Sequence, residues 1–234
     1  MGRSRRISSI EARVVAVLGA ALLLPLGSHA ETPAGPLAPR DECSAVPGLA
    51  ELVAHLERAL AARDADALLA LADDGILLDF GGGSGKAELR RRLNAPDYRL
   101  WDEIDRALAL GCGLSKPVDG DGGETYASWP WYFVADRDPP FDAFEAHIVT
   151  GEGVRLRSGP SLDAPVIGSV SWDYVRLVEP YTEESATRPY ARVETLGGQA
   201  GYIARAYLRS LVDYRLVASR VEGEWRLTAF VAGD

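Results

Sequence analysis

Four aromatic side chains in the second half of the sequence are the residues best suited to contact a ligand. They are Trp172, Tyr174, Tyr190 and Tyr202. Aromatic rings offer a large, rigid contact area with a polar edge, which suits stacking on sugars or on peptide groups. We therefore expect these side chains to line a binding groove, although at least half of them should also serve ordinary packing. The chemistry they supply is recognition of a ligand without its conversion.

A glycine-rich run, residues 81–86, follows an expected strand and precedes an expected helix, as a phosphate-binding loop does. The pattern departs from that loop at two positions. Phe80 stands in place of the first glycine, and Ala87 stands in place of the Ser or Thr that would hold magnesium. We interpret the run as a turn with Ser84 as a helix cap, and a weak anion site at the helix start is the alternative.

The sequence contains no recognisable catalytic or metal-binding pattern. His55 and His147 are isolated, and no Cys/His cluster or Gly-x-Ser-x-Gly motif is present. Asp119, Asp121 and Glu124 lie in one glycine-rich loop, but their spacing differs from that of a calcium-binding loop. We therefore expect no enzyme activity, no metal and no cofactor. The alternative is a cell-wall-targeted hydrolase with its chemistry in residues 48–147.

The first thirty residues have the three parts of a secretory signal peptide. Arg3, Arg5 and Arg6 form a basic head, an apolar run over residues 14–26 follows, and Ser28-His29-Ala30 closes it. The run is shorter than the ~20 residues that cross a bilayer as a helix. We expect cleavage after Ala30 and a periplasmic or secreted protein with no stable membrane insertion afterwards. An uncleaved interfacial anchor is the alternative, and both general and twin-arginine export stay open.

Charge and cysteine content limit the possible partners. The chain carries a net charge of −9, and residues 31–234 carry 21 basic and 33 acidic residues, a net charge of −12. Such a surface repels nucleic acid, so we expect no nucleic-acid partner. Cys43 and Cys112 are the two cysteines, and an even pair in an exported chain predicts a disulfide. Two buried thiols are the alternative.

The order of the elements predicts an α+β fold. Residues 31–47 are rich in proline and indicate a linker, and apolar residues then recur at helical spacing. We expect helices at 47–62, 65–72, 87–93 and 98–110, and strands at 76–80 and 126–134, in an N-terminal domain of residues 48–147. A short helix or part of a strand is expected at 141–147.

Short strands dominate the rest of the chain. Residues 148–210 alternate apolar and polar positions between glycine, proline and aspartate turns, which predicts a small β-barrel. A hairpin follows in the segment 211–234, with strands at 214–221 and 225–231 around Glu222-Gly223-Glu224. Because two strands alone are marginal, we expect the hairpin to fold back onto the N-terminal half, with the barrel as an insertion.

Residues 148–210 resemble a bacterial SH3-like domain of exported proteins. Three short blocks carry this resemblance: 154–161 (Val-Arg-Leu-Arg-Ser-Gly-Pro-Ser), 190–193 (Tyr-Ala-Arg-Val) and 201–203 (Gly-Tyr-Ile). The chain departs from the family at Arg155, where asparagine is common, at Trp172-Asp173, where Lys-Gly is frequent, and at Tyr190, where tryptophan is usual. The resemblance implies binding of the cell wall or of a peptide, with no catalysis by the barrel.

Residues 52–71 are faintly similar to the opening helices of nuclear-transport-factor-like cones, and the hairpin at 214–231 could supply the end of such a cone. Taken together, these observations predict a non-enzymatic exported protein whose SH3-like barrel recognises peptidoglycan or an envelope protein. A pure protein-interaction scaffold is a further alternative.

Overall fold

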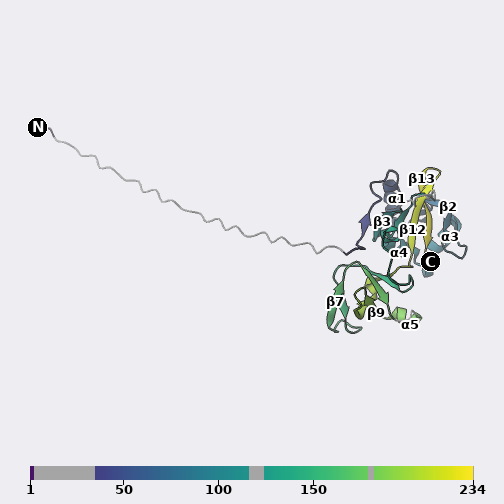
Figure 1. Ribbon diagram of the computed structural model, residues 1–234. Helices are drawn as coiled ribbons and strands as arrows, with labels where there is room; N and C mark the ends of the chain where they lie inside the picture. The colour runs from purple at the N-terminus through teal and green to yellow at the C-terminus, as the bar shows by residue number, and fades with distance from the viewer. Residues whose placement is uncertain (3–34, 116–123, 179–181, 234) are drawn as a thin grey trace. The chain divides into compact units, whose positions relative to one another are not determined.

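Figure 1 shows the computed structural model of the protein, which describes residues 1–2, 35–115, 124–178 and 182–233. Ala34–Asp234 form one compact unit. The expected signal peptide, its cleavage site and most of the calcium-loop candidate, including Asp119 and Asp121, lie outside the described residues. No helix among the described residues combines the length and the apolar character needed to cross a bilayer.

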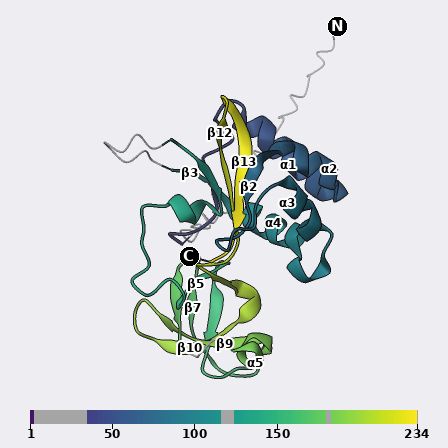
Figure 2. The same cartoon turned by 90° about the vertical axis from the view of Figure 1, so that its right-hand side faces the viewer.

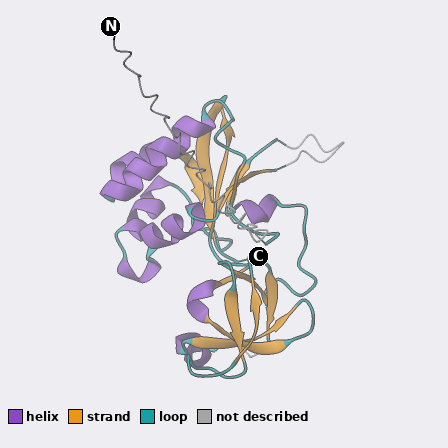
Figure 3. Cartoon of the chain, turned by 90° about the vertical axis from the view of Figure 1, so that its left-hand side faces the viewer, coloured by secondary structure: helices purple, strands orange, loops and turns teal. Residues whose placement is uncertain are grey.

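A mixed six-stranded sheet forms one layer of the protein, and four helices form a second layer against it. The chain is therefore α+β, as its sequence predicts. The strands follow the order β1-β3-β4-β12-β13-β2. Their bounds are β1 Arg40–Asp41, β2 Ala72–Leu77, β3 Gly111–Leu114, β4 Ala127–Trp129, β12 Arg215–Val221 and β13 Glu224–Val231. Helices lie on one face of this sheet (Figure 3), namely α1 Leu49–Ala62, α2 Ala65–Leu71, α3 Lys86–Leu93 and α4 Leu100–Leu108.

The four helices form where apolar residues recur every three or four positions. In α1, Leu49, Leu52 and Leu56 are buried and face the sheet. Asp64 begins α2, and its Oδ1 accepts a hydrogen bond from the Ala67 amide at 3.0 Å. The helices predicted at 47–62, 65–72 and 87–93 are thereby confirmed within two residues at each end.

The C-terminal hairpin belongs to this first sheet. β12 pairs with β4 and β13 pairs with β2, so the hairpin lies between strands that come much earlier in the sequence (Figure 2). Glu222 and Gly223 join the two strands, with φ angles of 52° and 89°, the left-handed geometry of a two-residue hairpin turn. This arrangement is the one that the fold-back hypothesis describes.

Residues 146–210 form a second sheet of seven strands in the order β11-β5-β8-β9-β10-β6-β7, with all pairs antiparallel. The bounds are β5 Ala146–Val149, β6 Val154–Arg157, β7 Val166–Val170, β8 Tyr174–Leu177, β9 Tyr190–Thr195, β10 Ala200–Ala204 and β11 Leu208–Ser210. One short helix, α5 Glu183–Thr187, precedes β9, and the 3-10 turn η3 Arg205–Tyr207 follows β10.

The second sheet is open, so the expectation of a closed SH3-like barrel is not met. The edge strands β11 and β7 do not pair with each other. Packing within the second sheet explains why apolar residues and a glycine occupy the positions that carry the family resemblance. Val154 and Leu156 face the core of this sheet, and a Cβ on Gly201 would lie 2.7 Å from Leu156 Cγ. Alternation of this kind is common to half-buried strands, and a strand glycine often marks a close approach in a sheet, so these residue types do not specify one family.

Three predicted elements differ from those in the structure. β4 ends at Trp129, and after Pro130 the 3-10 turn η2 Trp131–Val134 replaces the strand predicted up to residue 134. The strand predicted at 76–80 is shifted toward the N-terminus, since β2 begins at Ala72 and ends at Leu77. The helix predicted at 98–110 is divided into the 3-10 turn η1 Pro96–Tyr98 and α4.

The cysteine prediction is confirmed, because Cys43 and Cys112 form a disulfide with a Cα–Cα distance of 5.8 Å. The bridge joins the segment after β1 to β3, beyond the end of α4. A separate apolar cluster contains residues from the N-terminal segment, from the chain just before β3, from η2 and from strands β5 and β8 of the second sheet. Its buried members are Leu37, Leu110, Trp131, Tyr132, Ile148 and Tyr174, and we call it the junction cluster.

Candidate functional site

The outer face of the second sheet carries two half-buried tyrosines, Tyr190 and Tyr202, of the candidate site. In the β9–β10 pair, Tyr190 lies opposite Ala204 and Arg192 lies opposite Tyr202. The intervening residues Ala191, Val193 and Ile203 are fully buried on the inner face. Since side chains alternate along a strand, Tyr190, Arg192 and Tyr202 all point away from the core. The sequence alternation thus fixes which face can meet a ligand.

A pocket of about 280 Å³ opens between this face and the neighbouring loops. Tyr190 and Tyr207 supply its aromatic rings, and Leu162 supplies an aliphatic side chain. Tyr207 is 48% exposed and Leu162 is 76% exposed, which is unusual for large apolar residues. The pocket therefore offers an apolar contact surface that no described part of the chain covers.

Two arginines give the pocket its charge. Arg157 is 7% exposed, and its Nη1 donates a hydrogen bond to the Ala164 carbonyl at 2.8 Å, which fixes the guanidinium in place. Arg155 is exposed and makes no ion pair with any residue that the structure describes. Glu152 also lines the pocket. An acidic group on a ligand would find at least one unneutralised guanidinium here.

The structure does not bring the four predicted aromatic residues together. Tyr190 lines the pocket, and Tyr202 lies on the same face without lining it. Tyr174 is buried in the junction cluster, where its hydroxyl donates to the Arg137 carbonyl at 3.0 Å and burial raises its pKa. Trp172 packs against the same cluster in a left-handed conformation, φ 45°.

Tyr207 and Leu162 were not among the predicted site residues. Tyr207 ends the 3-10 turn η3 that follows β10, and Leu162 lies in the turn between β6 and β7. Their positions depend on how these turns fold back over the sheet, which local spacing does not reveal. The one available clue in the sequence is that both are large apolar residues inside segments that otherwise read as turns.

The glycine-rich run 81–86 is a structural turn built around Asp79. The amides of Gly81 and Gly83 both donate to Asp79 Oδ1 at 2.8 Å. Lys86 pairs with Asp74 at 2.7 Å. Because a carboxylate of the chain already occupies these donors, they are not free to hold a phosphate. Ser84 is not the helix cap, since Gly85 occupies that position.

A charged cluster between α3 and the turn after β2 is also internally neutralised. Arg92 is 7% exposed and donates to Glu88 at 2.7 Å, to the Leu78 carbonyl at 2.8 Å and to Asp79. Hydrogen bonds from Arg91 and then from Arg92 lower the pKa of Glu88 to about 2. This pairing favours a structural role, because a general acid or base needs a pKa near the working pH.

Histidines and metal ligands give no second site. His147 is buried, which lowers its pKa, and its Nδ1 lies 3.2 Å from the Glu145 carbonyl oxygen. His55 is exposed on α1. Within the described part of the chain, no group of three or more His, Cys, Asp or Glu side chains could hold a metal ion.

Comparison with known proteins identifies no family for the chain. No family model and no curated protein matches it. One similar solved structure is a protein of unknown function with a cystatin-like fold from Nostoc punctiforme, 14% identical, with a TM-score of 0.26 over 79% of this chain and 86% of the other. Another is an NTF2-like protein with a cystatin-like fold from Novosphingobium aromaticivorans, also 14% identical, with a TM-score of 0.27 over 79% and 77%.

These findings correct the family expectation. No family model matches residues 148–210, and their strands form an open sheet in which the edge strands β11 and β7 do not pair. The assignment of residues 148–210 to the bacterial SH3-like family is therefore wrong. The TM-scores of the two neighbours are too low to support an argument about this chain.

Proposed function

We propose that the protein is a non-enzymatic, exported binding protein that recognises peptidoglycan through the pocket between Tyr190 and Tyr207. The proposal rests on one observation. An uncovered aromatic and aliphatic surface lies beside Arg155, an exposed guanidinium with no ion-pair partner among the described residues. The signal-peptide pattern of residues 1–30 supports export to the compartment where this polymer is found.

Peptidoglycan matches the two kinds of contact that this pocket offers. Its sugar rings present apolar faces on which tyrosine rings can stack. Its peptide stems carry carboxylates, which an arginine binds with paired hydrogen bonds. A pocket of about 280 Å³ is at the small end of ligand sites, so it would hold one sugar ring or one short stretch of stem at a time.

Co-sedimentation with purified peptidoglycan sacculi tests this proposal. The protein without residues 1–30 should pellet with the sacculi, and Tyr190→Ala combined with Tyr207→Ala should leave it in the supernatant. Phe144→Ala is the matched control, because Phe144 is an aromatic residue 63% exposed outside the pocket. This control should pellet like the unmodified protein.

Two results would overturn the proposal in different ways. If the double variant pellets as well as the control, the polymer binds elsewhere on the protein. If the unmodified protein does not pellet, peptidoglycan is not the ligand, and an envelope protein recognised by the same pocket becomes the leading hypothesis.

A further inference from the structure

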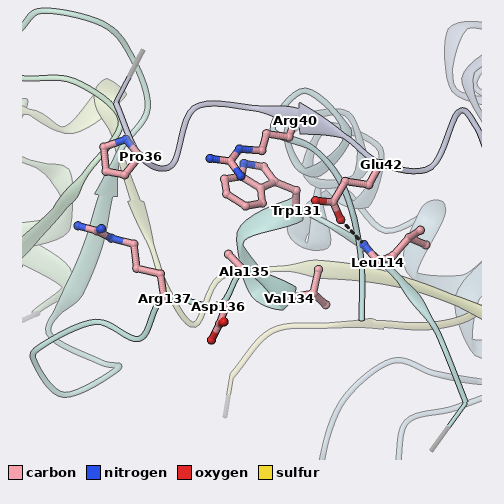
Figure 4. A pocket seen from close by; sticks show the side chains of 9 residues that line it. All are labelled: Pro36, Arg40, Glu42, Leu114, Trp131, Val134, Ala135, Asp136 and Arg137. Carbon is pink, nitrogen blue, oxygen red and sulfur yellow. Dashed lines mark hydrogen bonds between the residues drawn. The ribbon is translucent and has the colours of Figure 1, made fainter. Parts of the chain in front are cut away.

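A second pocket lies beside the first sheet, next to the N-terminal segment that contains β1. Residues 35–43, which we call the N-terminal strap, form one wall (Figure 4), and η2 with the residues after it forms the opposite wall. The cavity volume is about 300 Å³. Arg40, Trp131 and Arg137 are the lining residues that matter for its chemistry.

The strap is held at both ends. Leu37 is buried in the junction cluster, and its amide donates to the Trp172 carbonyl at 2.8 Å. Cys43 is bonded to Cys112. Between these anchors, Arg40 pairs with Gly111 in the β1–β3 ladder, and a Cβ on Gly111 would lie only 2.1 Å from the Arg40 carbonyl oxygen. The backbone of Arg40 is therefore fixed at the rim of the pocket.

This geometry presents a guanidinium whose charge is not neutralised. The Arg40 side chain lies over the Trp131 ring, with 4.4 Å between the guanidinium carbon and the ring centroid (Figure 4). Arg40 is exposed, and it makes no ion pair within residues 35–115, 124–178 and 182–233. Stacking on an aromatic ring orients a guanidinium without using its hydrogen-bond donors.

Two further donors accompany Arg40. Trp131 is 4% exposed, and its indole Nε1 has no hydrogen-bond acceptor in the described chain. A buried donor without an acceptor is costly, and it indicates a site that something else can satisfy. Arg137 lies across the pocket, where its Nη2 is 3.2 Å from Asp173 Oδ1, so its charge is partly balanced.

The acidic residues of the pocket do not neutralise Arg40. Glu42 accepts a hydrogen bond from the Leu114 amide at 3.0 Å, on the far side of Trp131 from Arg137. The Asp136 side chain points away from Arg40 in Figure 4. The Pro36 side of the pocket therefore has an excess of positive charge in a protein whose net charge is −9.

We propose that this pocket binds the carboxylate of a small organic acid, held by the Arg40 guanidinium against Trp131, with Arg137 on the opposite wall. A carboxylate matches the planar fork of an arginine that an aromatic ring already orients. This site is independent of the proposed peptidoglycan pocket, because it lies on the other sheet and shares no lining residue with it.

Isothermal titration calorimetry with N-acetylalanine tests the site, and the uncharged N-acetylalaninamide is the matched ligand. The acid should bind in a saturable way, and the amide should bind at least about tenfold more weakly, because a charged hydrogen bond is lost. Arg40→Gln should weaken binding of the acid by a similar factor. Arg58→Gln is the control, since it removes an exposed arginine of α1 that makes no ion pair with a described residue and lines neither pocket, and it should leave this affinity unchanged.

Arg40→Lys separates charge from geometry. It keeps the positive charge but lacks the planar fork, so its affinity should lie between those of the unmodified protein and Arg40→Gln. Equal binding of acid and amide, full affinity in Arg40→Gln, or no saturable binding to the unmodified protein would each overturn the proposal. Arg40→Gln should still pellet with sacculi, so failure of this site is distinguishable from failure of the peptidoglycan pocket.

Discussion

Leu216 of β12 lies opposite Trp129 of β4, so a residue near the end of the chain pairs with the middle of it. Leu216 is 1% exposed and belongs to the main core cluster. We expect Leu216→Ala to lower the free energy of unfolding by about 2–5 kcal/mol, as buried leucines do. Urea unfolding measures this change.

Val217 is the control for this prediction, because it is the next residue on the same strand and is only partly buried. Val217→Ala should cost clearly less than Leu216→Ala. Equal, small losses for the two variants would contradict the placement of the hairpin in the sheet.

The disulfide should contribute strongly to stability. Cys43 and Cys112 are 69 positions apart, and the chain-entropy relation gives about 4 kcal/mol for a closed loop of that size. Replacing both cysteines with serine should lower the free energy of unfolding by up to this amount. It should also weaken N-acetylalanine binding, because the bridge anchors one end of the strap that carries Arg40.

Reductant offers an independent check on the cysteine variant. Unmodified protein treated with reductant should unfold at the same denaturant concentration as the double serine variant. If reduction leaves the unfolding midpoint of the unmodified protein where it was, the bridge is not stabilising the fold.

His147 should make stability depend on pH. Burial lowers its pKa below the usual value of 6.5, with Arg205 acting in the same direction and Asp213 opposing it. The unfolded chain therefore binds a proton more readily than the folded protein does. The free energy of unfolding should be at its full value above pH 6.5 and should fall as the pH falls below it.

Denaturant unfolding between pH 7 and pH 5 measures this effect, and His147→Gln should flatten the slope. His55→Gln is the matched control, because His55 is exposed on α1, and its slope should equal that of the unmodified protein. An unchanged slope in His147→Gln would show that other groups cause the pH dependence.

Gly201 should not tolerate a side chain. A Cβ there would lie 2.7 Å from Leu156 Cγ and 2.9 Å from the Arg157 carbonyl oxygen. We expect Gly201→Ala to cost about 1–3 kcal/mol through overpacking. Gly159→Ala is the comparison, since its Cβ would meet Ala164 at an ordinary 3.4 Å. Thermal unfolding of the two variants should rank them in that order.

The local pattern of residues was sufficient to predict the helices and the hairpin turn. The spacing of Leu49, Leu52 and Leu56 predicts a helix with one buried face, because that face follows from the helical repeat alone. Glu222-Gly223 predicts a hairpin, because glycine adopts the required positive φ at no steric cost. These features depend on neighbours in the sequence, so the sequence reveals them.

The candidate site depends on long-range placement and was predicted only in part. Tyr190 and Tyr174 were predicted on the same ground, their aromatic side chains, yet Tyr190 lines the pocket and Tyr174 is buried in the junction cluster. Aromatic residues suit cores and ligand sites equally well. Sequence alone therefore does not distinguish a buried tyrosine from an exposed one, or indicate that Tyr207 and Leu162 meet.

The strand order of the first sheet has a consequence for how this protein is made. β12 and β13 separate β4 from β2, yet they follow every other strand of this sheet in the sequence. Until they emerge from the ribosome, the face against which α1–α4 pack is incomplete, and the pairing that closes it joins residues far apart in the chain. The first sheet therefore cannot close before Arg215–Val221 and Glu224–Val231 are available for pairing, which delays burial of the core that α1–α4 share with it.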